Sequence, residues 1–307
     1  MELPGGWAAT ARGYAEAAVV GEADGAVHTG FAICALDAGG VLPPHVHSFE
    51  ESFYILEGDG VVETAESSFL VSPGDYGLLP TGVPHAWRND GSAEVRWAQM
   101  QGPAPRTRFG GDTYQVPALH GHEVQAVDVR DPRTRRLGTI TPDHMDPGKQ
   151  GQGLLAVSAS MRTALLVYSG ITVKMMVDSD LGARLTTMFM VQYDPDGTAG
   201  PHDHPFEETY LFLEGTAEAE FDGERYQLQA GDAAWAGVGC VHGFANAGDG
   251  PLRWLETQSP QPPGRHAYRF VRDWRYLQDL LAPSDSSGHV PGGLPGGLLG
   301  HTGGDHG

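Results

Sequence analysis

An internal repeat constrains this sequence more than any other feature does. Adding a constant offset of 157 to a residue number in the first half often gives the same residue type in the second half. Because the offset does not change along the matched stretch, we infer that one domain was duplicated. The repeated residues include His45 and His202, His47 and His204, Glu51 and Glu208, His85 and His242, and Trp97 and Trp254.

Each copy is predicted to be built from short β-strands. Apolar or alternating runs are separated by Gly, Pro, Asn and Asp, and the chain contains 44 glycines and 22 prolines. Regularly spaced short strands with turn residues between them are typical of a sandwich or a small barrel, so we expect an all-β fold. The expected strands are 52–56, 60–64, 68–71, 77–79 and 95–99 in the first copy, and 209–213, 217–221, 225–228, 233–236 and 252–256 in the second.

Composition narrows the classes of partner. With 19 basic and 39 acidic residues the formal net charge is −20, which disfavours binding to nucleic acid or to an anionic membrane surface. Residues 1–12 contain no basic segment followed by an apolar run, and no apolar run is long enough to span a membrane. Only Cys34 and Cys240 are present, too few for a disulfide framework. We therefore expect a cytoplasmic protein.

The repeated histidines and glutamates have the spacing of metal ligands. In the first copy His45 and His47 lie two residues apart, so on a strand both imidazoles point to one face. Glu51 follows shortly afterwards, and His85 comes from a later strand, as a barrel interior requires when neighbouring strands supply the ligands. The second copy repeats the set as His202, His204, Glu208 and His242.

Three imidazoles and one carboxylate form a mixed nitrogen and oxygen site. Such a site suits a divalent transition metal, with Fe(II) or Mn(II) favoured and Ni, Cu or Zn as alternatives. A six-coordinate ion would keep two positions open, as catalytic sites do. We expect one ion in each barrel.

The residues around these candidates resemble the motifs of the cupin superfamily. The second copy departs from them twice, with Asp196 in place of the leading glycine and Gly237 in place of the motif proline. Neither change affects a candidate ligand, although both bear on loop geometry. The first copy meets the motif G-x5-H-x-H-x3-E-x6-G at Gly39, His45, His47, Glu51 and Gly58, and G-x5-P-x-G-x2-H-x3-N at Gly74, Pro80, Gly82, His85 and Asn89.

The resemblance covers residues 30–103 and 187–260 and implies a two-domain cupin, or bicupin. It implies two jelly-roll-like β-barrels with a metal inside the wider mouth of each. We expect a barrel over 1–110, a linker with the entering strands of the second copy over 111–150, and a second barrel over 151–282. A short helix is expected at 274–281, and the Gly-rich tail 283–307 is expected to be disordered.

The resemblance favours a metal-dependent dioxygenase of the quercetinase type, acting on a small hydroxylated or aromatic substrate. Glu51 or Glu208 could then act as a general base, provided that an apolar pocket raises its pKa. A non-oxidative bicupin enzyme (isomerase, decarboxylase or aminohydrolase) is the alternative, and the x3 spacing before the glutamate argues mildly against oxalate decarboxylase. A small-molecule-binding cupin without turnover is the third reading. The expected partner is a small-molecule substrate, bound by a monomer or a homodimer.

Overall fold

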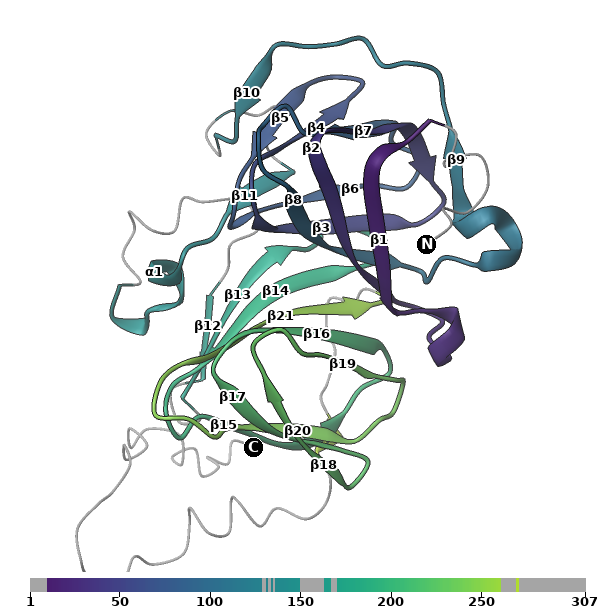
Figure 1. Ribbon diagram of the computed structural model, residues 1–307. Helices are drawn as coiled ribbons and strands as arrows, with labels where there is room; N and C mark the ends of the chain where they lie inside the picture. The colour runs from purple at the N-terminus through teal and green to yellow at the C-terminus, as the bar shows by residue number, and fades with distance from the viewer. Residues whose placement is uncertain are drawn as a thin grey trace, which may run out of the picture. The chain divides into compact units, whose positions relative to one another are not determined.

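The structure is a computed structural model that describes residues 10–128, 131, 134, 136–149 and 170–260, together with the backbone of 163–166 and 269–270. The expected helix at 274–281 and the tail 283–307 lie outside these residues. Within them the fold is all-β, as predicted, and the strands form two barrels that repeat each other (Figure 1). None of the helices in the described ranges has the length and apolar character that a membrane crossing needs.

The first barrel is an 11-stranded sheet with the order β10-β5-β4-β7-β2-β8-β3-β6-β11, to which β1 and β9 add through β2. Short 3-10 helices at Glu22–Asp24 and Thr107–Asp112 flank it. The strands are β1 Arg12–Val20, β2 Gly30–His47, β3 Glu50–Glu57, β4 Gly60–Thr64, β5 Ser68–Val71, β6 Asp75–Leu79, β7 His85–Arg88, β8 Val95–Gly102, β9 Thr113–Gln115, β10 Val124–Ala126 and β11 Leu137–Thr139.

The second barrel consists of a 6-stranded sheet, β12-β13-β14-β21-β16-β19, and a 5-stranded sheet, β18-β17-β20-β15-β22. All ten strands expected from the sequence are present, extended by a few residues at some ends. The strands of this barrel are β12 Thr163–Leu166, β13 Ile171–Val177, β14 Thr187–Tyr193, β15 Thr198–Asp203, β16 Glu207–Glu214, β17 Thr216–Phe221, β18 Glu224–Gln229, β19 Ala233–Ala236, β20 His242–Asn246, β21 Leu252–Ser259 and β22 Arg269–Phe270.

One strand of the first barrel corresponds to two strands of the second. β2 runs without interruption and carries His45 and His47 at its end, whereas its counterpart is divided into β14 and β15. The division contains Pro195, which has no N–H to donate to a ladder. At the same turn Asp196 replaces Gly39, and both residues are left-handed, with φ of 66° and 71°. Because Asp tolerates this conformation better than most residues, the departure from the cupin motif preserves the turn.

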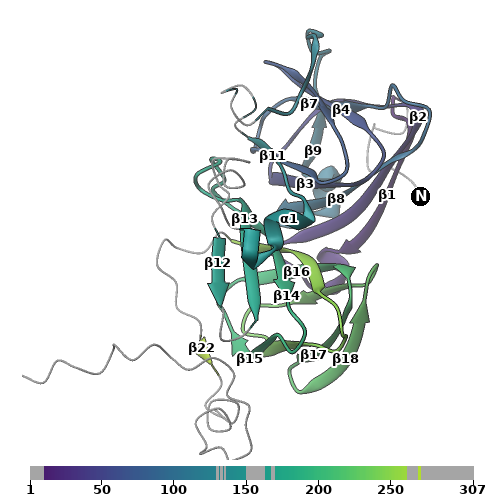
Figure 2. The ribbon, with the colours of Figure 1, turned by 90° about the vertical axis from the view of Figure 1, so that its left-hand side faces the viewer.

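The segment 111–150 differs from expectation. β9, β10 and β11 pair with β2, β5 and β6 of the first barrel, so they complete that barrel and are not entering strands of the second. Each has only three residues, too few to show an alternation that would reveal its partner. The short helix α1, Pro142–Met145, with the 3-10 turn Pro147–Lys149 after it, lies against β13, as Figure 2 shows.

Three buried clusters form the core. One fills the first barrel around Trp87 and Trp97, whose rings stack at 4.6 Å. Another fills the second barrel around Phe244 and Trp254. The third joins side chains of both barrels, because Met100 and Met188 belong to one continuous cluster.

Two glutamates connect the barrels reciprocally. The Glu50 carboxylate accepts hydrogen bonds from the backbone N–H groups of Arg184, Leu185 and Thr186, at 2.7, 2.7 and 3.1 Å. The Glu207 carboxylate accepts the equivalent bonds from residues 27–29 at 2.9 to 3.2 Å. Both carboxylates are buried, and each lies next to a predicted metal ligand in the sequence. Glu50 and Glu207 are therefore structural, because their carboxylates are used between the barrels and point away from the ligands next to them.

Candidate metal centres and the adjoining cavity

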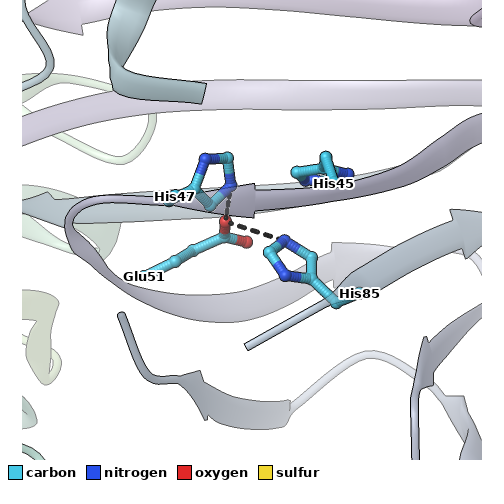
Figure 3. A group of neighbouring side chains, drawn as sticks. All are labelled: His45, His47, Glu51 and His85. Carbon is cyan, nitrogen blue, oxygen red and sulfur yellow. Dashed lines mark ion pairs between the residues drawn. The ribbon is translucent and has the colours of Figure 1, made fainter. Parts of the chain in front are cut away.

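The structure brings the four predicted ligands of the first barrel together. His45 and His47 lie on β2, Glu51 on β3 and His85 on β7, and one donor atom from each lies within 4.8 Å of the others. In Figure 3 the side chains of His47 and His85 face the Glu51 carboxylate. Glu51 Oε2 lies 3.0 Å from His47 Nε2 and 3.6 Å from His85 Nε2. All four side chains are buried.

Hydrogen bonds at the Nδ1 atoms orient the imidazoles. The Nδ1 atoms of His45 and His85 lie 2.7 and 2.9 Å from the carbonyl oxygens of Pro43 and Val83, which can only accept. Nδ1 of His47 lies 2.8 Å from the Thr113 hydroxyl, which itself donates to a carbonyl. Each Nδ1 therefore carries the proton, and each Nε2 presents a lone pair to the centre of the site.

This arrangement fits a metal ion. His47 Nε2, His85 Nε2 and Glu51 Oε1 are buried and make no hydrogen bond in the described residues. Buried polar atoms are normally satisfied, and neutral imidazole nitrogens and a carboxylate oxygen are donors that a divalent transition metal accepts. Burial, with the neighbouring His85 and His47 adding to it, lowers the pKa of His45 well below its usual value, so this ring is neutral at pH 7. The residues present therefore fit the predicted ion.

The condition set for Glu51 and Glu208 as general bases, a raised pKa, is not met in the metal-free protein. Burial does raise the pKa of Glu51, but the adjacent imidazoles of His47 and His85 outweigh it and leave the pKa lowered. The pKa of Glu208 is also lowered, since His242, His204 and Tyr210 outweigh burial. The expectation of a raised pKa considered the apolar surroundings of the carboxylates and not the histidines that contact them.

Each site has one histidine that stacks on a phenylalanine. The rings of His47 and Phe49 are 4.2 Å apart at 16°, and those of His204 and Phe206 are 4.3 Å apart at 12°. Both phenylalanines are buried, so each fixes the plane of its imidazole. Phe49 and Phe206 thus support the candidate ligands directly.

The second barrel brings its three histidines together in the same way. Donor atoms of His202, His204 and His242 lie within 4.8 Å of one another. His202 lies on β15, His204 directly follows that strand, and His242 begins β20. The Nδ1 atoms of His202 and His242 contact the carbonyl oxygens of Gly200 and Cys240 at 2.8 and 3.0 Å. Cys240 thus contributes a carbonyl oxygen, and its thiol is not part of the group.

Glu208 does not belong to that group, which distinguishes the second site from the first. Its Oε1 lies 3.4 Å from His204 Nε2 and its Oε2 lies 3.1 Å from His242 Nε2. However, Oε1 also accepts a hydrogen bond from Gln258 Nε2 at 2.6 Å, and Oε2 accepts one from the Tyr210 hydroxyl. The carboxylate is therefore shared between the histidines and two neutral donors.

A second acid lies behind Glu208. Burial and the adjacent Glu208 raise the pKa of Glu256 well above its usual value, so Glu256 retains its proton while Glu208 is ionised. Trp254 Nε1 donates to Glu256 at 2.9 Å. Burial lowers the pKa of His242, but hydrogen bonds to Cys240 and Glu208 outweigh burial and raise this pKa to about 10. In the metal-free protein His242 and Glu208 thus form a buried ion pair.

A cavity of about 300 Å³ adjoins the first site. His45 and His47 are among its lining residues, and the apolar side chains of Phe31, Leu42 and Trp87 form much of its wall. Among the described residues that line it there is neither a lysine nor an arginine. The cavity can therefore accept a neutral aromatic molecule next to the ligands, and it offers no cation to a carboxylate.

Two polar residues of this cavity were not predicted from the sequence. Tyr14 and Glu16 lie on β1, upstream of both motifs, and line the cavity beside β2, the strand that carries His45 and His47. β1 alternates small apolar and polar residues in the segment YAEA, but nothing in that pattern indicates that its polar face is turned toward the metal site.

Comparison with known proteins agrees with the geometry. The Cupin domain family matches twice, at residues 32–100 and 189–257. The chain is 27% identical over 119 residues to the tetracenomycin polyketide synthase protein TcmJ of Streptomyces glaucescens, which covers 37% of this chain and 80% of that protein. It is 30% identical over 84 residues to the polyketide synthase CurC of Streptomyces cyaneus, and the match covers 27% of this chain and 54% of that protein. The chain thus spans about half of CurC.

Solved structures with both barrels also match. Oxalate decarboxylase from Bacillus subtilis at pH 4.6 has a TM-score of 0.56 at 17% identity, over 89% of this chain and 79% of that chain. The formate complex of Lactobacillus farciminis oxalate decarboxylase has a TM-score of 0.58 at 18% identity, over 89% and 91%. These likenesses concern the fold. With two family matches at the two copies of the repeat and two barrels in one chain, this protein belongs to the cupin superfamily as a bicupin.

Proposed function

We propose that this bicupin is a metal-dependent dioxygenase that acts in its first barrel on a neutral, hydroxylated aromatic substrate. The observation that carries the proposal is the cavity beside His45 and His47, which is walled by aromatic and aliphatic side chains and lacks a cation among its described lining residues. The similarity to two polyketide synthase proteins supports it, because polyketides are carbon frameworks rich in hydroxyl and carbonyl groups.

The chain supplies the binding and orienting parts of such a reaction. His45, His47, His85 and Glu51 would hold the ion, which when bound acts as a Lewis acid toward a substrate oxygen. Trp87, Phe31 and Leu42 exclude water from one side of the cavity and contact an aromatic ring.

Glu51 is the candidate general base. The two groups that lower its pKa are the imidazoles of His47 and His85, whose Nε2 atoms would also hold the ion. Were Glu51 to leave the ion while the two imidazoles stay bound to it, burial would raise its pKa toward the range of a general base. Glu208 would play this role in the second barrel only after release from Tyr210 and Gln258.

A non-oxidative reaction is the second candidate, and one observation favours it. In the second barrel the protonated Glu256 lies next to the ionised Glu208, so a proton is stored beside the ligands, as an isomerase or a decarboxylase would need. The fold shared with oxalate decarboxylases is compatible with this. In the first barrel, by contrast, a dianionic substrate would find Glu16, Glu22 and Asp24 and no cation among the described lining residues.

The test uses the full chain, purified without added metal and reloaded separately with Fe(II) and Mn(II). Oxygen uptake is measured with catechols and flavonols, alongside product formation under strict anaerobiosis. The dioxygenase proposal expects oxygen uptake that is lost in His47→Ala. Turnover without oxygen would favour the non-oxidative reaction, and ligand binding without any turnover would show a binding protein.

A further inference from the structure

Strand β1 places a tyrosine and a glutamate in the cavity of the first barrel. β1 pairs with β2 so that Tyr14 lies opposite Leu36 and Glu16 opposite Cys34. Because side chains alternate along a strand, Tyr14 and Glu16 share a face, and both line the cavity together with His45. The intervening Ala15 is exposed on the other face.

Glu16 keeps acceptor capacity that the protein does not use. Tyr14 donates its hydroxyl proton to Glu16 Oε2 at 2.9 Å, and no other side chain or backbone group of the described residues hydrogen-bonds this carboxylate. An ionised carboxylate accepts about four hydrogen bonds. Burial raises the pKa of Glu16, and the hydrogen bond from Tyr14 offsets this rise only in part, so the carboxylate has room for a further donor. A ligand hydroxyl in the cavity would supply one.

Tyr14 is itself held in place. Its hydroxyl lies 3.3 Å from Cys34 Sγ, and the Cys34 thiol lies 3.3 Å from Gln99 Oε1, which also accepts from Trp97 Nε1 at 3.2 Å. The ring of Tyr14 lies 6.1 Å from that of Trp97. This chain of contacts fixes the direction of the hydroxyl and therefore the position of the Glu16 carboxylate.

The second barrel shows that the fold does not require this pair. Its strand β13 pairs with β14 as β1 pairs with β2, and the residues at the equivalent register are Ile171, opposite Tyr193, and Val173, opposite Val191. Both are apolar. The tyrosine and the glutamate at these positions are thus found in the first barrel and not in the second. The first barrel is also the one in which all four candidate ligands come together beside a cavity.

We propose that Glu16, positioned by Tyr14, determines the substrate specificity of the first barrel: it accepts a hydrogen bond from a hydroxyl group of the substrate and repels substrates that carry a carboxylate. This inference rests on the proposed function only in taking the cavity as the substrate site. It concerns which molecule binds and not which reaction follows.

The experiment compares two probes that differ by one carboxylate. Binding of catechol and of 3,4-dihydroxybenzoate to the metal-loaded full chain is measured by isothermal titration calorimetry. The wild-type protein should prefer catechol. Glu16→Gln should weaken catechol binding about tenfold, since a hydrogen bond to a charged group is lost, and should strengthen binding of the carboxylated probe. The preference therefore reverses, which a purely structural role would not produce.

Three further variants keep the test decisive. Glu16→Asp retains the charge and should retain the preference for catechol, and Tyr14→Phe should weaken catechol binding by a smaller factor. Glu218→Gln, an exposed residue of the second barrel, removes one negative charge from the protein and should change neither affinity. Thermal unfolding followed by circular dichroism checks that each variant folds.

The outcomes separate this inference from the proposed function. Equal changes for both probes in Glu16→Gln, or no change, would overturn the inference even if oxygen uptake is found. A reversed preference without oxygen uptake would support the inference and leave only the oxidative chemistry wrong. Binding of neither probe by the wild-type protein would contradict both.

Discussion

The two metal sites have the same ligand types but different carboxylates. In the first barrel one oxygen of Glu51 faces two histidines and the other makes no hydrogen bond in the described residues. In the second barrel both oxygens of Glu208 accept bonds from Gln258 and Tyr210. The residue at the position of Tyr210 is Phe53 in the first barrel, which has no hydroxyl to donate. Two sites with the same ligand motif can therefore differ in how freely the carboxylate can bind a metal ion.

The difference also separates the charge states of the sites. His45 and His47 have lowered pKa values, because burial disfavours the charged form, so they bind a metal without losing a proton at pH 7. His242, with a pKa raised to about 10, is protonated at pH 7 and must lose its proton first. We thus expect the first site to bind metal more readily, and the following predictions test that expectation in order of decreasing effect.

The largest effect should come from removing one ligand in each barrel. His47→Ala should abolish oxygen uptake and reduce metal content by one ion per chain. Only three of the four candidate ligands of the first site remain, and the Glu51 carboxylate no longer has the His47 imidazole beside it. His204→Ala should also remove one ion but should affect oxygen uptake much less. Elemental analysis and an oxygen electrode measure both. Equal loss of uptake in the two variants would mean that the second site shares the catalysis.

The second effect is a dependence of metal affinity on pH that differs between the sites. Because His242 must be neutral to bind, affinity at the second site should rise about tenfold per pH unit toward its pKa, hence roughly a hundredfold from pH 6.5 to 8.5. The wild-type protein and the His47→Ala and His204→Ala variants, titrated against a chelator, report on each site. A second site with no such slope would contradict the buried ion pair between His242 and Glu208.

A smaller effect is expected when Tyr210 is changed. Tyr210→Phe removes one of the two competing donors from Glu208, so metal affinity of the second site should rise by about tenfold. Tyr226→Phe is the matched control, because Tyr226 donates in the same way to Glu224 two residues earlier but is exposed. Competition with a chelator measures both, and an unchanged or lower affinity in Tyr210→Phe would show that Tyr210 supports Glu208 as a ligand.

The grouping of His45, His47, Glu51 and His85, and of His202, His204 and His242, could be predicted because these residues are encoded in local spacing and in the repeat. His45 and His47 lie on one strand face, and the constant offset identified their counterparts without any structure. The competition for Glu208 could not be predicted in the same way. It depends on whether the ring of Tyr210 turns its hydroxyl toward the Glu208 carboxylate, and the sequence does not encode that orientation.

The parts of the fold that were missed depend on pairing between distant segments. β1 lies outside both motifs, so the position of Glu16 in the cavity follows only from its register with β2. β9 pairs with the strand of His45 and His47 and places Thr113 against His47, although its three residues carry no pattern of their own. Such contacts are set by the closure of the barrel, which a local sequence window does not contain.

The reciprocal bonds of Glu50 and Glu207 have a consequence for how such a chain can evolve. Each half offers an acid to the other and receives one in return, which is the self-complementary contact of a two-fold symmetric dimer. In a fused chain that contact no longer depends on protein concentration, since the partner is always attached. Each half can then differ around its own site, as it does with Phe53 against Tyr210 and with Glu16 against Val173, while the contact between the halves is kept.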